Sequence, residues 1–216
     1  MISVCKSKGR YDANNDISQT LKILFFDKTI GRAERMENKF NYRLQQIDKS
    51  AIARNLIDIL QSDAIIMDKT RSFVINWLRT GPDEKRKAFF DVWDLVLKSY
   101  LPSSRPVLFR SCQRKNVNGK IASFTGRLEC ARRFSGGKGA LLICDTNELL
   151  EYETRYYKLG SYKHTFYPLV DLLKKAKNDG GWGFTERLLS EFVVEDEYIM
   201  RISPGHIHAL RWIPDI

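Results

Sequence analysis

Apolar side chains recur at helical spacing through the first half of the chain, and three amphipathic helices are predicted there. Ser50 is the expected cap of the first helix and Thr70 of the second, while the third starts at Pro82 and ends before Pro102. A charged surface helix is expected before them, from Ala33 to about Ile47. The residues expected on the buried faces are Ile52, Leu56, Ile59, Leu60, Val74, Trp77, Leu78, Phe89, Val92, Trp93, Val96, Leu97 and Tyr100. Stripes of this kind indicate core rather than a ligand site.

The pattern changes after residue 102, where short β-type runs alternate with shorter helical ones. The expected strands are VLFRSC (107–112), KIASFT (120–125), GALLICD (139–145), EFVVEDEYIMRI (191–202) and HIHALRWI (206–213). The expected helices are LECARRF (128–134) and PLVDLLKKAK (168–177). Glycines predict a loop at NDGGWGF (178–184), and Ser203-Pro204-Gly205 predicts a turn. The chain therefore reads as α+β, with a mainly helical region over 1–102 and a mixed sheet domain over 103–216.

Composition and charge restrict the classes of partner. Hydrophobic residues make up 43% of the 216 residues, which is enough for a packed core, and the formal net charge is +10. No apolar run approaches the roughly 18 residues that span a bilayer, and the N-terminus carries no secretory pattern, so we expect no membrane association. A basic surface attracts polyanions such as RNA or DNA, although a merely basic globular protein has the same composition.

The cysteines and histidines give no metal-binding pattern. Cys5, Cys112, Cys130 and Cys144 form no CxxC pair, and the three histidines form no HExxH motif. We expect free thiols in a reducing compartment, which favours a cytoplasmic location, and no structural metal.

Charged and hydroxyl side chains stand out on three of the predicted strands. Glu195 and Glu197 are two apart, so on one strand they would share a face, although paired acids also mark ordinary solvated strands. Arg110 interrupts a run that otherwise favours burial, and it needs an anionic partner, either a phosphate group or an acid such as Glu197. Ser123 and Thr125 place two hydroxyls on one face of another strand.

This order of motifs resembles the arginine–serine–glutamate class of mono-ADP-ribosyltransferases. The likeness rests on an arginine strand, a Ser-x-Thr strand, the LECARRF helix, a further strand, and a late Glu-x-Glu with Phe192 three residues before its first acid. Residues 70–216 carry the resemblance, and the helical lead-in is similar to that of small phage-encoded members. It implies a core of two packed small β-sheets over 103–216, with the region 1–102 packed against it.

The resemblance also implies how NAD, as co-substrate, would be held without a metal. Arg110 would bind the diphosphate or the adjacent ribose phosphate. Ser123, with Phe124 and Thr125 on the same strand, would hold the nicotinamide ribose. Glu197 would bond the ribose 2′-hydroxyl and stabilise the oxocarbenium-like centre as nicotinamide leaves.

The acceptor side of the site is implied by the same family. Glu195 would orient or deprotonate the acceptor, and Phe192 would contact it from a mobile loop with Gly180, Gly181 and Gly183 as hinges. The acceptor itself stays open between a protein arginine and RNA or DNA, since basic and aromatic residues such as those of RYYKLGSYKHTFY (155–167) suit single strands.

Two classes of function therefore remain. The first is an NAD-dependent transferase, acting as a phage or toxin-type effector on transcription or translation in the (host) cytoplasm and held in check by an inhibitor or antitoxin protein. The second is a basic nucleic-acid-binding protein on a degenerate, non-catalytic transferase fold.

Overall fold

The computed structural model describes residues 44–81, 84–112, 119–149, 165–202 and 207–212. Residues 44–216 form one compact unit. The helices are α3 (Gln46–Gln61), α4 (Asp68–Arg79), α5 (Lys87–Ser99), α6 (Leu128–Ser135), α8 (Leu169–Asn178) and α9 (Glu186–Glu195). The strands are β1 (Val107–Cys112), β2 (Ile121–Thr125), β3 (Ala140–Asp145), β4 (Phe166–Tyr167), β5 (Glu197–Arg201) and β6 (His208–Arg211). The expected α+β class is confirmed.

The three predicted helices of the first half are present, but their predicted starts are wrong, and the third begins at Lys87 rather than at Pro82. Ser50 lies inside α3 and Thr70 inside α4, whose N-caps are Gln45 and Met67, without a side-chain capping bond. Thr70 is fully buried. The helical period locates the buried face of a helix, whereas its first residue depends on local contacts that the period does not encode. The expected surface helix over 33–47 lies outside the described residues up to residue 43.

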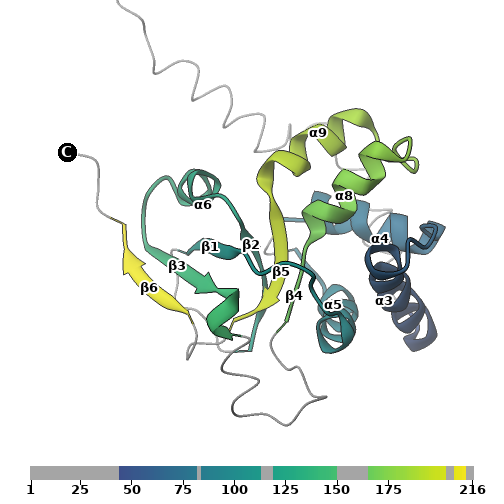
Figure 1. The fold of residues 1–216 in the computed structure, drawn as a ribbon, viewed down its shortest axis with the longest axis horizontal. Helices are drawn as coiled ribbons and strands as arrows, with labels where there is room; N and C mark the ends of the chain where they lie inside the picture. The colour runs from purple at the N-terminus through teal and green to yellow at the C-terminus, as the bar shows by residue number, and fades with distance from the viewer. Residues whose placement is uncertain (1–43, 82–83, 113–118, 150–164, 203–206, 213–216) are drawn as a thin grey trace, which may run out of the picture. The chain divides into compact units, whose positions relative to one another are not determined.

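Helices α3, α4 and α5 share an aromatic core with the sheet. Trp93 of α5 contacts Tyr167 of β4 with ring centroids 5.5 Å apart, and Trp77 of α4 meets Trp93 at 5.4 Å. The Tyr167 hydroxyl donates a hydrogen bond to the Leu56 carbonyl of α3 at 2.8 Å. Figure 1 shows these helices on the β4–β5 side of the sheet, where α5 is the one next to both strands and α3 and α4 lie farther out, whereas α6 accompanies β1 and β2. The helical region is therefore continuous with the sheet domain in its packing.

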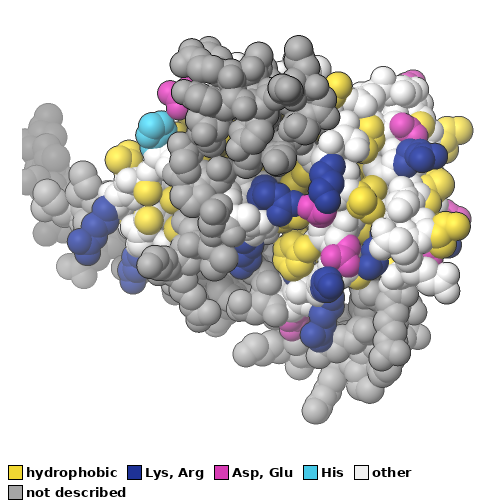
Figure 2. Space-filling model, turned by 90° about the horizontal axis from the view of Figure 1, so that it is seen from below, with side chains coloured by type: hydrophobic (Ala, Val, Ile, Leu, Met, Phe, Trp, Pro, Cys, Tyr) yellow, Lys and Arg dark blue, Asp and Glu magenta, His cyan; other side chains and the backbone are white. Residues whose placement is uncertain are grey.

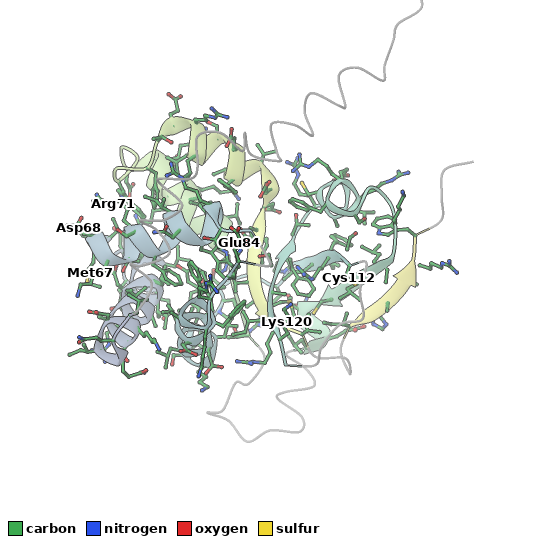
Figure 3. All side chains as sticks on the ribbon, turned by 180° about the vertical axis from the view of Figure 1, so that it is seen from behind. Met67, Asp68, Arg71, Glu84, Cys112 and Lys120 are labelled. Atoms are coloured by element: carbon green, nitrogen blue, oxygen red, sulfur yellow. The ribbon has the colours of Figure 1, made fainter. Side chains whose placement is uncertain are left out.

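The described strands form a single antiparallel sheet in the order β4-β5-β2-β1-β3-β6. Two packed small sheets were expected, and in hydrogen bonding this expectation is wrong. The sheet is nevertheless weakly joined at its centre: β1 pairs with β2 through Phe109 and Thr125 alone, while β1 with β3 and β2 with β5 pair along their whole length. Two three-stranded parts thus meet at the β1–β2 junction. Figure 3 labels Cys112, the last residue of β1, and Lys120, which precedes β2.

The expected strand over 191–202 is only half correct. Residues 186–195 form α9, Asp196 takes a left-handed conformation (φ 52°), and β5 begins at Glu197. The hydroxyl of Thr185 caps α9 by accepting the Leu188 N–H at 3.3 Å. Because helix, left-handed residue and strand follow one another, Glu195 and Glu197 do not have strand spacing. The expected turn at Ser203-Pro204-Gly205 and the tyrosine-rich segment up to residue 164 lie outside the described residues.

Candidate functional site

The strands that carry the three sequence motifs are neighbours. Arg110 is on β1, Ser123 and Thr125 are on β2, and Glu197 begins β5, in the spatial order β1-β2-β5. Thr125 pairs with both Phe109 and Glu197, so the three strands meet at one level of the sheet. The motif residues are therefore assembled where the two parts of the sheet separate.

Arg110 spans the β1–β2 junction. Its Nη1 donates to the Ser123 carbonyl at 2.6 Å, a bond that takes the place of a missing strand pair. Its Nε is buried without a hydrogen-bond partner, and within the described part of the chain the guanidinium forms no ion pair. Burial lowers the pKa of Arg110, opposed by the charges of Cys112 and Glu197, yet arginine keeps its proton in proteins. A buried cation with a free donor is suited to an anionic ligand.

The strand register places Arg110 and Glu197 on opposite faces. Arg110 pairs with the core residue Leu142, so its side chain lies on the core face of the sheet. Tyr198 also lies on the core face, and Glu197, which precedes it along β5, therefore points to the other face. From its own face, the Arg110 guanidinium reaches the backbone carbonyl of Ser123 on the neighbouring strand. Its charge still acts on Lys85, as do those of Glu195 and Glu197, so the four ionisable groups share one neighbourhood.

Glu197 is oriented by a residue that the sequence did not single out as functional. The indole Nε1 of Trp77, on α4, donates to Glu197 Oε1 at 3.1 Å across 120 positions of sequence. Trp77 is 1% exposed and is held by edge contacts to Phe89, Phe90 and Trp93. The helical region thus supplies a rigid donor to the proposed catalytic acid.

Lys85 is the second residue missed at the sequence level. It lies in the connection from α4 to α5, and its Nζ is 3.6 Å from the centroid of the Trp77 ring. Glu84, the preceding residue, lies between α4 and β5 in the view of Figure 3. Burial lowers the pKa of Lys85 to about 8, against the raising effect of Glu197 and Glu195. Only its place in a charged run, DEKRK (83–87), was visible in the sequence, and such runs are ordinarily solvated.

Glu195, the last residue of α9, lies close enough to Glu197 for their charges to interact. Burial, followed by repulsion from Glu197, raises the pKa of Glu195 to about 7. Arg133 of α6 and Lys85 act in the opposite direction, and Arg133 Nη2 lies 3.7 Å from Glu195 Oε1. A carboxyl group that titrates near neutrality can take up and release a proton at physiological pH.

Thr125 connects the Ser-x-Thr strand to the acids. It is 4% exposed, and its hydroxyl donates to the Glu195 carbonyl at 2.7 Å and accepts the Arg127 N–H at 3.1 Å. Ser123 is half-buried on the same face of β2. Phe124 points the other way, into the core, where it is 2% exposed. Thr125 therefore positions Glu195, and Phe124 packs rather than lining the site.

The expected acceptor loop has a different conformation. Phe192 lies half-buried within α9 and not in a loop, so that prediction is wrong. Gly180, Gly181 and Gly183 do form the connection between α8 and α9, and all three have positive φ values. They let the chain turn into the Thr185 cap, which starts the helix that ends at Glu195.

The described residues contain no group of three His, Cys, Asp or Glu side chains that could hold a metal ion. Among them, no helix combines the length and the apolar character that crossing a membrane requires. Comparisons with family models, with curated proteins and with solved structures found no match.

Proposed function

We propose that the protein is an NAD-dependent mono-ADP-ribosyltransferase that moves ADP-ribose from NAD to a macromolecule and releases nicotinamide. The observation that carries this proposal is the meeting of β1, β2 and β5: Ser123 and Glu197 share one face of the sheet there, and Arg110 reaches the Ser123 carbonyl from the opposite face. The Nε of Arg110, which is buried and has no hydrogen-bond partner within the described ranges, supports a role in binding the NAD diphosphate.

The proposed chemistry breaks the bond between the ribose C1′ and the pyridinium nitrogen. The bonding electron pair leaves with nicotinamide, and positive charge develops at C1′. The Glu197 carboxylate, fixed by Trp77, stabilises that charge where it forms. An acceptor nucleophile then bonds to C1′ and gives its proton to Glu195, whose pKa of about 7 suits a general base.

The acceptor is a protein arginine or a nucleic acid in this proposal. The net charge of +10 favours a polyanion, and it equally suits the second candidate, a non-catalytic nucleic-acid-binding protein. On the face shown in Figure 2, however, Lys and Arg side chains lie beside acidic ones and form no continuous basic surface among the described residues. An effector of the phage or toxin type, acting on transcription or translation in the cytoplasm and restrained by an inhibitor protein, is consistent with either acceptor.

The acceptor class is tested by incubating the protein with NAD labelled in its adenylate part and a bacterial lysate. Digestion of one half with protease and the other with nuclease then locates the label. We expect label on one class of macromolecule, and Glu197→Gln should reduce it by roughly 10²–10³-fold because a preorganised charge is lost. Glu191→Gln is the matched control, since Glu191 is an exposed acid of α9 paired with Arg187. Nucleic-acid binding without any label would support the second candidate.

A further inference from the structure

The exposed side of α6 and the turn that follows it carry a group of cations. Arg132, Arg133 and Lys138 are all exposed. Two acids offset part of this charge, since Glu129 of α6 is also exposed and Glu195 Oε1 lies 3.7 Å from Arg133 Nη2. The cations outnumber these acids, so this part of the surface attracts anions.

The turn between α6 and β3 brings these cations close to an aromatic side chain. Arg132 lies along the turn, since its Nε is 3.7 Å from the position that a Cβ on Gly137 would take. Trp212, just after β6, donates its backbone N–H to the Gly139 carbonyl at 3.2 Å, and its indole Nε1 donates to the Ser111 hydroxyl at 2.9 Å. Figure 1 shows the chain passing from α6 into β3, which pairs with β6. Trp212 is therefore fixed beside the end of the turn.

Phe134 adds a second aromatic ring, at the beginning of the turn. It is 58% exposed, and the guanidinium carbon of Arg133 lies 5.4 Å from its ring centroid. An exposed ring beside cations is the combination that holds single-stranded nucleic acids, because bases stack on the ring while phosphates bind the charges.

Helix α6 and Trp212 lie on the same face of the sheet. The hydroxyl of Thr125, on the face away from the core, accepts the N–H of Arg127, where α6 starts. Ser111, which Trp212 contacts, is on that face as well, because its neighbour Arg110 points toward the core. The residues on this side that we name the α6 surface are Arg132, Arg133, Phe134, Lys138 and Trp212.

We propose that the α6 surface binds single-stranded RNA, with phosphates at its cations and an unpaired base stacked on Phe134. RNA fits this surface because its loops and ends offer unpaired bases, whereas a duplex hides the faces of its bases. The inference locates a contact that the net charge alone does not place. It concerns binding only, so it holds whether or not the chain transfers ADP-ribose.

The test measures the binding of fluorescein-labelled dodecauridylate by anisotropy at low salt. Phe134→Leu keeps an apolar side chain but loses the flat ring, and it should weaken binding by roughly tenfold. Phe134→Trp should bind at least as tightly as the parent protein. Leu101→Ala is the matched control, because Leu101 is 54% exposed and lies outside the α6 surface.

A second measurement follows the affinity as the salt concentration rises. Each phosphate neutralised on a single strand contributes about 0.7 to the slope of log affinity against log salt concentration. Lys138→Gln should reduce the slope by about that amount, whereas Lys177→Gln, at an exposed lysine of α8, should keep the parental slope. This measurement decides if Phe134→Leu does not fold.

Competitors distinguish the occupants. Duplex RNA of equal length and polyglutamate should displace the probe at least tenfold more weakly than unlabelled dodecauridylate, and oligodeoxythymidylate no better than it. The proposal is overturned by equal affinities in the parent and Phe134→Leu, by an unchanged slope in Lys138→Gln, or by no binding to the parent. Equal competition by the duplex or polyglutamate, or tighter binding of the DNA, overturns it as well. No NAD is present, so the result is separable from the proposed transfer reaction.

Discussion

Glu195 links the protonation of a single carboxyl to the stability of the fold. Its pKa is about 7 in the folded chain and near 4.5 when exposed, so the folded state retains a proton that the unfolded state loses between these values. The associated stabilisation is complete below pH 4.5 and is lost as the pH rises through 7. At about 1.4 kcal/mol per pH unit, the free energy of unfolding should fall by on the order of 3 kcal/mol across this window.

Urea unfolding at pH 5 and pH 8 measures this loss. Glu195→Gln has no ionisable group at this position, so it should not show the loss of about 3 kcal/mol that Glu195 causes in the parent protein. The fall in its unfolding free energy between pH 5 and pH 8 should be smaller than the parent's by roughly that amount. Glu186→Gln, at an exposed acid in the first turn of the same helix, should behave as the parent protein does. The assignment is refuted by identical pH dependence in the parent and Glu195→Gln.

Trp77 is a positioning residue, and its effect on Glu197 is separable from its packing. Trp77→Phe keeps an aromatic ring but removes the N–H that orients the carboxylate, a bond to a charged group worth about 1.5–3 kcal/mol. The proposed transferase should lose roughly tenfold or more in kcat with little change in the KM for NAD, because the binding groups on β1 and β2 remain.

Trp93→Phe is a matched control for that variant. Trp93 is equally buried, but its indole Nε1 has no hydrogen-bond partner among the described residues. The substitution therefore removes comparable volume without removing a bond to any of them. Its kcat should remain close to that of the parent. Equal losses of kcat in the two variants would show that packing, rather than the bond to Glu197, explains the effect of Trp77.

At the scale of elements, the junction between α9 and β5 decides where both acids lie. Gly126, which follows β2, donates its N–H to the Asp196 carbonyl at 3.1 Å, and a Cβ at this glycine would collide with the Asp196 carboxylate and approach the Tyr198 ring to 3.4 Å. Asp196 is the left-handed residue between the two glutamates. Crowding there should displace Glu195 and Glu197 together.

Gly126→Ala should therefore reduce the proposed transferase activity by more than tenfold and lower the unfolding free energy by roughly 1–3 kcal/mol, as overpacking commonly does. Gly81→Ala, where a Cβ meets nothing within 4 Å, should leave activity unchanged. Adding Asp196→Gly to Gly126→Ala should restore much of the activity, since it removes the colliding carboxylate and glycine accepts a positive φ. If the double variant is no more active than Gly126→Ala alone, the collision with Asp196 does not explain the loss of activity.

The same junction shows why the sequence predicted some elements and not others. The buried faces of α3, α4 and α5 were predictable because apolar residues recur at helical spacing over about a dozen positions, which is a stronger signal than the preference of any single residue. In α9, Phe192-Val193-Val194 favours a strand by composition, although Leu188, Leu189 and Phe192 have helical spacing after a Thr185 cap. The left-handed turn at Asp196, which ends the helix, is a single-residue feature that aspartate permits but does not impose.

The candidate site was likewise predictable in part. Arg110, Ser123 and Glu197 are polar or charged residues within strand-like runs, so their residue types alone mark them as candidates. Trp77 and Lys85 gave no such signal: Trp77 looked like one more core aromatic, and its bond to Glu197 depends on docking α4 against β5. Their role is a property of tertiary packing.

For the whole molecule, the aromatic core joins the helices to the sheet. Tyr167 is fully buried, contacts Trp93 and Tyr100, and bonds the Leu56 carbonyl of α3. Tyr167→Phe should lower the unfolding free energy by about 1–2 kcal/mol and retain a single cooperative transition by both fluorescence and circular dichroism. Tyr198→Phe, at a tyrosine 8% exposed, should have the smaller effect. Separate transitions for the two probes would mean that helices and sheet unfold independently.

The central claim is that the β1–β2–β5 junction cleaves NAD, and nicotinamide release by the purified protein tests it without knowledge of the acceptor. Nicotinamide is measured chromatographically over time with the parent protein, Glu197→Gln and Glu191→Gln. We predict release by the parent and by Glu191→Gln at similar rates, and a loss of roughly 10²–10³-fold in Glu197→Gln with its fold intact. Release by Glu197→Gln at the parental rate, or none from the parent with or without lysate, would contradict it.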